Sequence, residues 1–250
     1  VTAAGEVLRA RVLIACDGRE SPIARRAGIR RVSWGYDQTG LVSAVSFPRE
    51  HEGVARQRFL PGGPFAVLPL PGRRASLVWT ERTAEARRIA ALDDAAHLRE
   101  VEARMGGALG PLTLVGRRWS YPLKFTLAED WVAPRLALVG DAAHSVHPIA
   151  GQGLNLGVRD AAALAEVLGE ARRRGEDLGA PDVLERYQRW RRFDAVSLAL
   201  GMDGLNRLMS NDVPALRALR DAGLSAVERL PGLKRAFMRV AAGASGDAPR

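Results

Sequence analysis

Residues 138–157 constrain the fold of this chain more than any other stretch, and their sequence is LVGDAAHSVHPIAGQGLNLG. An apolar strand over 136–139 is predicted to lead into Gly140 and Asp141, then into a loop of small residues, and then, after Gly151-Gln152-Gly153, into a long helix. Glycines let a backbone approach a ligand closely, and a helix start presents N–H groups with partial positive charge. The stretch therefore predicts a site for a flat, polar ligand, with the Asp141 carboxylate placed to accept hydrogen bonds from sugar hydroxyls.

Two other interpretations of this stretch fit it less well. GQGLNLG differs from the GxGxxG fingerprint because its third glycine comes one residue late and no matching acid follows about 20 residues on, so a nicotinamide-binding Rossmann turn is not predicted. Asp141, His144 and His147 recur at a spacing that suits a metal only on a helix, whereas Gly140 and Pro148 predict a loop. We therefore predict no metal site and expect both histidines to be structural or to support ligand-binding residues.

The composition indicates a globular protein with a sizeable core, since 47% of the 250 residues are hydrophobic. No apolar run is long enough to cross a membrane and no signal peptide is visible, so we expect a cytoplasmic protein. The net charge of +9 is spread through amphipathic helices, which argues against nucleic acid, although attraction to anionic lipid head groups stays open. The single Cys16 excludes an intrachain disulfide and is expected to be buried at the end of an apolar strand.

Hydrophobic periodicity and turn residues predict three regions. The first 30 residues are expected to form a short hairpin, an interior strand and a helix that Ser21 caps, Pro22 starts and Gly28 ends. The next region, to about 125, is predicted to be mostly strand with one helical stretch over 83–106; its clearest strands are 40–47, 54–60, 65–70 and 75–80.

The last region is predicted to be helical. The first of its helices should bury an apolar stripe at positions spaced three and four apart, namely Leu154, Val158, Ala161, Ala165 and Leu168. Further helices are predicted at 181–209, 212–222 and 231–242, and the last eight residues are expected to be loose.

Two motifs resemble those of the single-component flavoprotein aromatic hydroxylases, the family typified by para-hydroxybenzoate hydroxylase. The sequence GDAAHSVHPIAGQGLNLGVRDAAALAEVL, from Gly140, resembles the second flavin-binding motif of that family, and VLIACDGRESPIARRAGI, residues 12–29, resembles its DG motif. The stretches 34–45, 63–70 and 203–224 narrow the resemblance to the ubiquinone-biosynthesis hydroxylases. The resemblance runs through nearly the whole chain.

The resemblance implies an α/β fold, α+β within this chain, with a partial Rossmann-like FAD-binding domain. The FAD-binding parts are expected at 1–34 and 126–175, a mostly β-sheet substrate domain at 35–125, and a helical region at 176–250. The GxGxxG unit with which this family begins does not occur in the sequence. We therefore expect a fragment that lacks roughly the first 150 residues of the family pattern and is inactive alone.

The implied function is an FAD-dependent monooxygenase that uses NAD(P)H and O2 to hydroxylate a polyprenylated phenol in ubiquinone biosynthesis. By the resemblance, Asp141 matches the acceptor for the ribityl hydroxyls, and Pro148 lies where the chain passes the reactive edge of the flavin. The expected cofactor-binding residues are Asp17, Gly18, Gly140, Asp141, Pro148, Gly151, Gln152, Gly153, Leu154 and Asn155. No catalytic base is predicted.

Some alternatives stay open at this stage. The family usually has an arginine three residues after the DG-motif serine, where this chain has Ala24 followed by Arg25. The protein is alternatively a hydroxylase or epoxidase for another apolar substrate, or an inactive interaction subunit. An apolar stripe of Leu233, Phe237 and Val240 beside basic residues predicts either an exit for a prenyl tail, a contact with a membrane surface or biosynthetic complex, or plain core packing.

Overall fold

The computed structural model describes residues 5, 7–107, 109–210, 223, 227 and 229–241. The chain divides into two compact units. Unit 1 comprises Val1–Trp34, Lys124–Asp203 and Val227–Arg250, and unit 2 comprises Gly35–Leu123 and Gly204–Ala226. The mixture of parallel and antiparallel strands with long helices confirms the α/β class expected from the sequence.

Unit 1 contains a three-stranded sheet in the order β1-β8-β7. Strand β1 (Leu13–Ala15) runs parallel to β8 (Leu136–Leu138), which pairs antiparallel with β7 (Val132–Ala133). The expected hairpin before β1 is not found, because the described residues 7–12 form no strand. Cys16 is exposed rather than buried. The reason is that β1 lies at the sheet edge with Leu13 and Ile14 exposed, so its end does not enter the core.

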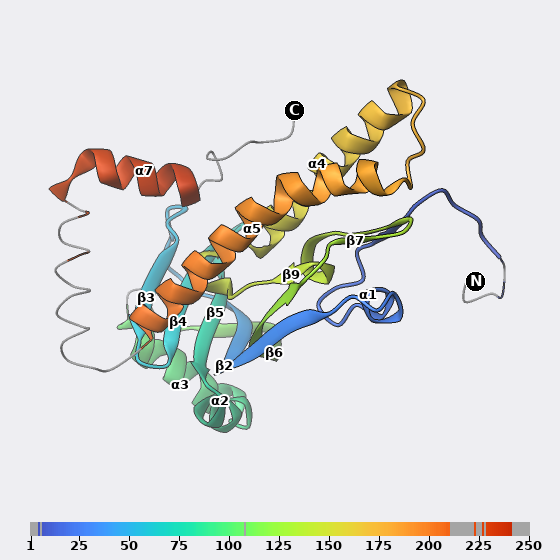
Figure 1. Ribbon diagram of the computed structural model, residues 1–250. Coiled ribbons are helices and arrows are strands. Elements are labelled where there is room, and N and C mark those ends of the chain that lie inside the picture. The colour runs from blue at the N-terminus through green and yellow to red at the C-terminus, as the bar shows by residue number, and fades with distance from the viewer. Residues whose placement is uncertain are drawn as a thin grey trace. The chain divides into compact units, whose positions relative to one another are not determined.

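The helices of unit 1 follow the predicted order. The first is α1 (Pro22–Arg26), where Ser21 Oγ accepts from Ala24 N at 3.0 Å and Gly28 has a φ of +73°, which confirms the predicted cap and stop. Figure 1 shows the long helices α4 (Gly153–Arg173) and α5 (Pro181–Met209) side by side. The loop before α4 holds the short 3-10 helices η1 (Gly140–Ala142) and η2 (Pro148–Ala150) and the two-residue strand β9 (His144–Ser145).

The predicted buried stripe of α4 is wrong. Leu154 and Val158 are 78% and 59% exposed. The buried face is instead formed by Leu156, Asp160, Ala163, Leu164, Val167 and Ala171. Helix α4 has apolar residues on several sides. The side that packs against the rest of the protein is the one that carries Asp160, and this acid is tolerated there because buried partners satisfy its carboxylate.

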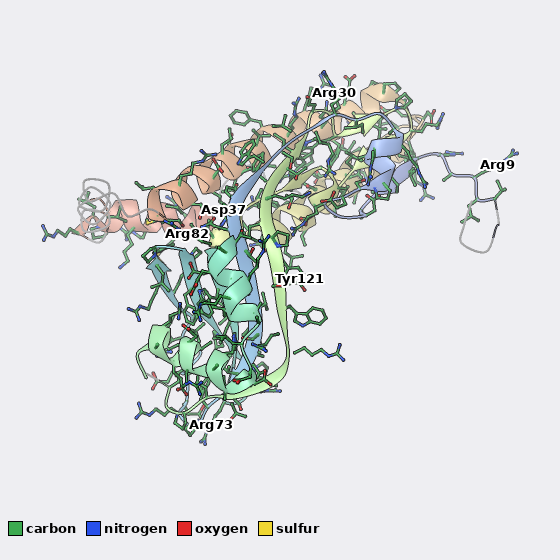
Figure 2. The ribbon with its side chains drawn as sticks, turned by 90° about the horizontal axis from the view of Figure 1, so that it is seen from below. Arg9, Arg30, Asp37, Arg73, Arg82 and Tyr121 are labelled. Atoms are coloured by element: carbon green, nitrogen blue, oxygen red, sulfur yellow. The ribbon has the colours of Figure 1, made fainter. Side chains whose placement is uncertain are left out.

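Unit 2 is built on an antiparallel sheet of β3 (Arg56–Leu60), β4 (Gly63–Leu70), β5 (Arg74–Arg82), β2 (Arg31–Ser46) and β6 (Thr113–Ala128), in that order. The predicted strands are confirmed, but β2 and β6 are each 16 residues long and begin in one unit and end in the other. In the register of β2 with β5, Gln38 faces Arg82 and Ser46 faces Arg74. Figure 2 accordingly shows Asp37 and Arg82 at one end of this sheet and Arg73 at the other.

Two helices cover this sheet instead of the single helical stretch predicted over 83–106. Helix α2 (Thr83–Ala90) ends before Asp93, whose carboxylate accepts from Ala96 N at 2.7 Å and caps α3 (Asp94–Met105). The apolar sides of both helices pack against the inner face of the sheet. The core formed in this way includes Leu77, Trp79, Ile89 and Val101.

The C-terminal predictions are only partly covered. Helix α7 (Pro231–Ala241) confirms the last predicted helix. The predicted helix over 212–222, the side chains of Leu233, Phe237 and Val240, and the last eight residues lie outside the described residues. None of the helices described here is long and apolar enough to span a bilayer.

Candidate functional site

The loop between β8 and α4 is held close to the helix by two glycines. Gly140 has a φ of +62°, a left-handed conformation that a Cβ disfavours. The Cα of Gly157, one turn into α4, lies 3.5 Å from the point where a Cβ on Gly140 would stand. The strand end and the first turn of the helix therefore meet through their backbones. The close approach of this backbone to a ligand, for which the glycines were singled out, stays a prediction.

The buried carboxylate of Asp160 holds the start of this loop in place. Asp160, on α4, is 0% exposed, and its Oδ2 accepts from His144 Nε2 at 2.6 Å and from Gly140 N at 3.2 Å. Its other oxygen accepts from Arg191 Nε of α5 at 3.0 Å. A buried carboxylate is tolerated when it is paired and fully hydrogen-bonded. His144 is thus a structural residue, and Asp160 and Arg191, which the sequence analysis did not single out, hold the loop.

The side chain of Arg31, which the sequence analysis also did not single out, holds the same loop in place. The guanidinium of Arg31, the first residue of β2, donates from Nη2 to Ala142 O at 3.1 Å and to Asp141 O at 3.4 Å. Its Nη1 donates to Arg19 O at 2.6 Å. Arg31 therefore joins two segments that the sequence identified separately, the DG-motif turn and the Gly140–Ala142 helix, although they are more than 100 residues apart in the chain.

Asp141 is the acid of this loop that remains available. The side chain is half-buried, and among the described residues no hydrogen bond or ion pair engages its carboxylate, while its carbonyl faces Arg31. Asp160, on the neighbouring helix α4, shows how the protein satisfies a carboxylate here, and Asp141 has none of these partners. This contrast fits a carboxylate that serves a ligand.

Helix α4 begins at the end of the loop that contains Asp141. Among the described residues, no side chain caps this helix start. Gln152 occupies the N-cap position without a side-chain cap, and its Oε1 accepts from Asn155 Nδ2 at 3.2 Å. Gly151 before it has a φ of +63°. The N–H groups of Gly153, Leu154 and Asn155 belong to the first turn, whose donors lack intrahelical acceptors. Because Leu154 and Asn155 are exposed, an anionic or polar group can reach this turn.

His147 supports the turn that contains Pro148. Its Nδ1 accepts from Ile149 N at 3.1 Å, which caps η2, and the ring is 1% exposed. Burial lowers the pKa of His147 to about 4, against a smaller opposing effect of Asp203. The ring is therefore neutral at pH 7. Among the described residues, no three His, Cys, Asp or Glu side chains gather in a group that could hold a metal ion.

The DG-motif residues form a tight turn at the start of α1. Asp17 Oδ1 accepts from Ser21 Oγ at 2.6 Å, and its Oδ2 accepts from Ile23 N at 3.1 Å. Burial acts to raise the pKa of Asp17, but these hydrogen bonds outweigh it and the pKa lies below its ordinary value. Gly18 has a φ of +82°. Asp17 thus already serves the helix cap, while the exposed Arg25 donates to Glu20 O and the side chain of Ala24 is buried.

Among curated proteins, this chain is similar to several whose names refer to ubiquinone. The ubiquinone hydroxylase UbiL of Rhodospirillum rubrum is 48% identical over 239 residues, which is 96% of this chain and 56% of that protein. The 3-demethoxyubiquinol 3-hydroxylase of Escherichia coli is 40% identical over 96% of this chain and 61% of its own length. The human ubiquinone biosynthesis monooxygenase COQ6 is 34% identical over 95% of this chain and 58% of its own length. The chain thus spans a little over half the length of these relatives.

Solved structures share the fold. The probable FAD-dependent monooxygenase pqsL of Pseudomonas aeruginosa superposes with a TM-score of 0.69 at 28% identity, over 83% of this chain and 58% of that one. The Diels-Alderase PyrE3 superposes with a TM-score of 0.76 over 99% of this chain and 53% of that one, at 24% identity, and shows the fold alone. The family described as FAD binding domain matches residues 2–198. The chain belongs to this FAD-binding domain family, as its two motifs predicted.

Proposed function

We propose that this chain is the part of an FAD-dependent monooxygenase that carries the flavin-facing loop, and that the enzyme hydroxylates a prenylated phenol in ubiquinone biosynthesis with NAD(P)H and O2. The similarity to ubiquinone hydroxylases over at least 95% of the chain carries the proposal. In this proposal unit 1, with its two FAD-binding segments at 1–34 and 126–175, holds the flavin. The sheet over 35–125 contributes the substrate side, and the helical region follows from 176.

The geometry of the loop fits a flavin. The Asp141 carboxylate, which no described protein group engages, suits the ribityl hydroxyls, and Pro148 and Gly151 form the turn that would face the ring system. The first-turn N–H groups of α4 suit the pyrimidine edge, where they would stabilise negative charge. Asp17 and Gly18 would serve through the turn they form rather than through a free carboxylate.

In this arrangement the cofactor and the protein have different roles. Bound FAD would supply the transfer of electrons from NAD(P)H to O2 and of oxygen to the ring. The described residues contribute positioning and charge: Asp160 and Arg31 hold the loop at fixed distances, and the α4 N-terminus presents its dipole. The role of catalytic base is assigned to no residue.

The substrate class rests on the relatives and not on a cavity. A phenol with a long prenyl chain needs a pocket for the ring and an apolar path for the tail. We further propose that the protein works at a membrane surface where such substrates reside, held by peripheral contact or within a biosynthetic complex.

The test uses the gene product that carries this sequence, expressed in full and loaded with FAD. NAD(P)H oxidation, hydrogen peroxide release and hydroxylated product are measured with a prenylated phenol and with 4-hydroxybenzoate. The proposal expects product to account for most of the NAD(P)H oxidised with the prenylated phenol, and mainly hydrogen peroxide with 4-hydroxybenzoate. Equal turnover of both phenols would refute the ubiquinone assignment but not the flavin assignment, and a protein that takes up no FAD would refute both.

A further inference from the structure

Unit 2 contains a small cavity between its two helices and the strands β2 and β6. Its volume is about 180 Å³, and its lining includes Leu41, Ile89, Ala90, His97, Arg118 and Trp119. All of these residues belong to unit 2, whereas the loop proposed to face the flavin belongs to unit 1. For comparison, a cavity of roughly 150 Å³ with apolar walls takes up benzene. The cavity therefore has room for an apolar group of about six carbon atoms.

Part of the lining is apolar. Leu41 and Ile89 are buried residues of the core of unit 2, and Ala90 follows Ile89 at the end of α2. Trp119 of β6 is 54% exposed although it is a large aromatic residue. Water gains no hydrogen bonds from aliphatic walls, so this part of the cavity favours an apolar occupant.

The side chain of His97 also lines the cavity, and its hydrogen bonding is incomplete. The residue is 3% exposed, its Nε2 lies 3.4 Å from Ser43 Oγ, and its Nδ1 is buried with no partner among the described residues. Burial and the charge of Arg118 lower the pKa of His97, so the ring is neutral at pH 7. When Ser43 Oγ donates to Nε2, the proton of the neutral ring lies on Nδ1, which is then a donor.

Arg118 contributes a second buried donor to the same cavity. Its Nε lies 3.2 Å from Asp94 Oδ1, and its Nη2 donates to Leu92 O at 2.6 Å. The pair with Asp94 is a weak one, because that carboxylate is largely exposed. The Nη1 atom of Arg118 is buried and has no partner among the described residues.

Two such donors in the lining of one cavity point to an occupant with an acceptor group, because a buried donor without an acceptor is costly. Neighbouring atoms cover both nitrogens, so the two side chains have to turn toward the acceptor as it enters. Water would satisfy the donors but would leave the apolar part of the cavity without a matching partner. An occupant with one polar end and one apolar end suits both parts.

We propose that this cavity binds a small carboxylate whose apolar part is about the size of a six-carbon ring. The apolar part would lie against Leu41, Ile89 and Ala90, and the carboxylate would accept hydrogen bonds from Arg118 Nη1 and His97 Nδ1. A carboxylate suits this end better than a neutral acceptor, because a guanidinium binds it through charge-assisted hydrogen bonds. The site is independent of the proposed function, since it uses no residue of the flavin-facing loop and needs no FAD.

Isothermal titration calorimetry of the full gene product tests the inference. The probes are cyclohexanecarboxylate and cyclohexanemethanol, which share a ring but differ in charge. We expect a dissociation constant of about 1 mM or lower for the acid. The alcohol should bind about tenfold more weakly, because the charge-assisted hydrogen bonds are lost. Neither FAD nor a prenylated phenol should change the affinity for the acid.

Three substitutions locate the site. Ala90→Leu places a larger side chain in the cavity at a helical position that leucine suits, and it should abolish the binding of both probes. Arg118→Met should weaken the binding of the acid about tenfold and leave that of the alcohol nearly unchanged. The matched control is Arg117→Met, which removes the neighbouring exposed guanidinium and should alter neither affinity. Unfolding temperatures show which variants are folded, and Ala90→Leu decides if Arg118→Met is not.

Three results would overturn the inference and leave the proposed function in place. Cyclohexanecarboxylate that does not bind at up to about 10 mM would mean that the cavity takes up water only. Equal affinity of Ala90→Leu and the unaltered protein for the acid would place its binding elsewhere. Displacement of the acid by a prenylated phenol would make the cavity a part of the substrate site. A protein that binds the acid but takes up no FAD would instead overturn the proposed function and support this inference.

Discussion

Asp160 Oδ2 accepts a hydrogen bond from His144 Nε2 at 2.6 Å in a region where both side chains are almost fully buried. The same carboxylate binds Arg191 and the backbone of Gly140. One acid thus ties helix α4 to helix α5, to β9 and to the loop proposed to face the flavin.

Removing this acid should be costly. Asp160→Ala removes one of the two carboxylates that bind the buried guanidinium of Arg191, the other being Asp194 at 2.8 Å, and it takes the acceptor from His144 Nε2 and Gly140 N. We expect a loss of about 3–5 kcal/mol in the free energy of unfolding. Urea unfolding followed by circular dichroism measures the loss. The control is Glu129→Gln, which breaks the exposed Arg30–Glu129 pair and should cost no more than about 1 kcal/mol. Similar losses in both variants would show that the buried network is not a stabilising unit.

The two glycines that meet at the loop should respond differently to a methyl group. Gly140→Ala forces a Cβ into a left-handed conformation, and we expect it to cost about 1–2 kcal/mol. Gly157→Ala adds its Cβ at 3.4 Å from the Cα of Gly140, at the edge of ordinary contact. Its gain in helix propensity should keep its stability within about 1 kcal/mol of the unaltered protein. Thermal unfolding compares the two, and a reversed order would contradict the geometry.

Stability should fall at acid pH through His147. Its pKa is about 4 in the folded protein and about 6.5 when unfolded, so between these values the unfolded chain binds more protons. The contribution is therefore present above pH 6.5 and is lost as the pH falls towards 4, by up to about 3 kcal/mol. In His147→Asn this part of the pH dependence should vanish. The midpoints of urea unfolding at pH 4.5, 5.5 and 7 measure this pH dependence in both proteins. An equal fall of the midpoint with pH in His147→Asn would refute the assignment to His147.

Asp141 should matter for the cofactor and not for the fold. Asp141→Ala in the full gene product should weaken FAD binding by about 1–3 kcal/mol, because hydrogen bonds to a charged acceptor are lost. The unfolding temperature without FAD should stay the same, since no described protein group depends on this carboxylate. Equilibrium dialysis gives the affinity, with the exposed Asp130→Ala as the control. Equal flavin content in the two variants would reduce Asp141 to a turn residue.

Local signals in the sequence predicted much of the fold. The cap at Ser21, the glycine at 28 and the helix of Pro181–Met209 are all found where turn residues and periodicity placed them. Gly140 and Gly151, which were singled out for a close approach to a ligand, both adopt left-handed conformations that favour glycine. These features depend on residues near one another in the chain.

The rest depends on contacts between distant segments. The buried face of α4 was misplaced because a hydrophobic pattern puts Asp160 outside, and only its partners on α5 and β9 explain its burial. The bridging role of Arg31 was invisible because its acceptors are backbone carbonyls, which any sequence offers. The first half of β2 also alternates, with Val32, Trp34 and Tyr36 at every second position, but the predicted strand began only at Gly40, so the full length of β2 was missed. The ligand-binding roles of the site residues stay predictions.

The exposed thiol at the end of β1 has a practical consequence. Cys16 is the single cysteine of the chain and directly precedes Asp17, so a maleimide dye has one thiol to label, at the edge of the DG-motif turn. Because Arg31 links that turn to the Asp141 loop, such a dye would report by fluorescence when a ligand reaches either segment. The protein thus carries its own attachment point for a spectroscopic reporter, without any engineered residue.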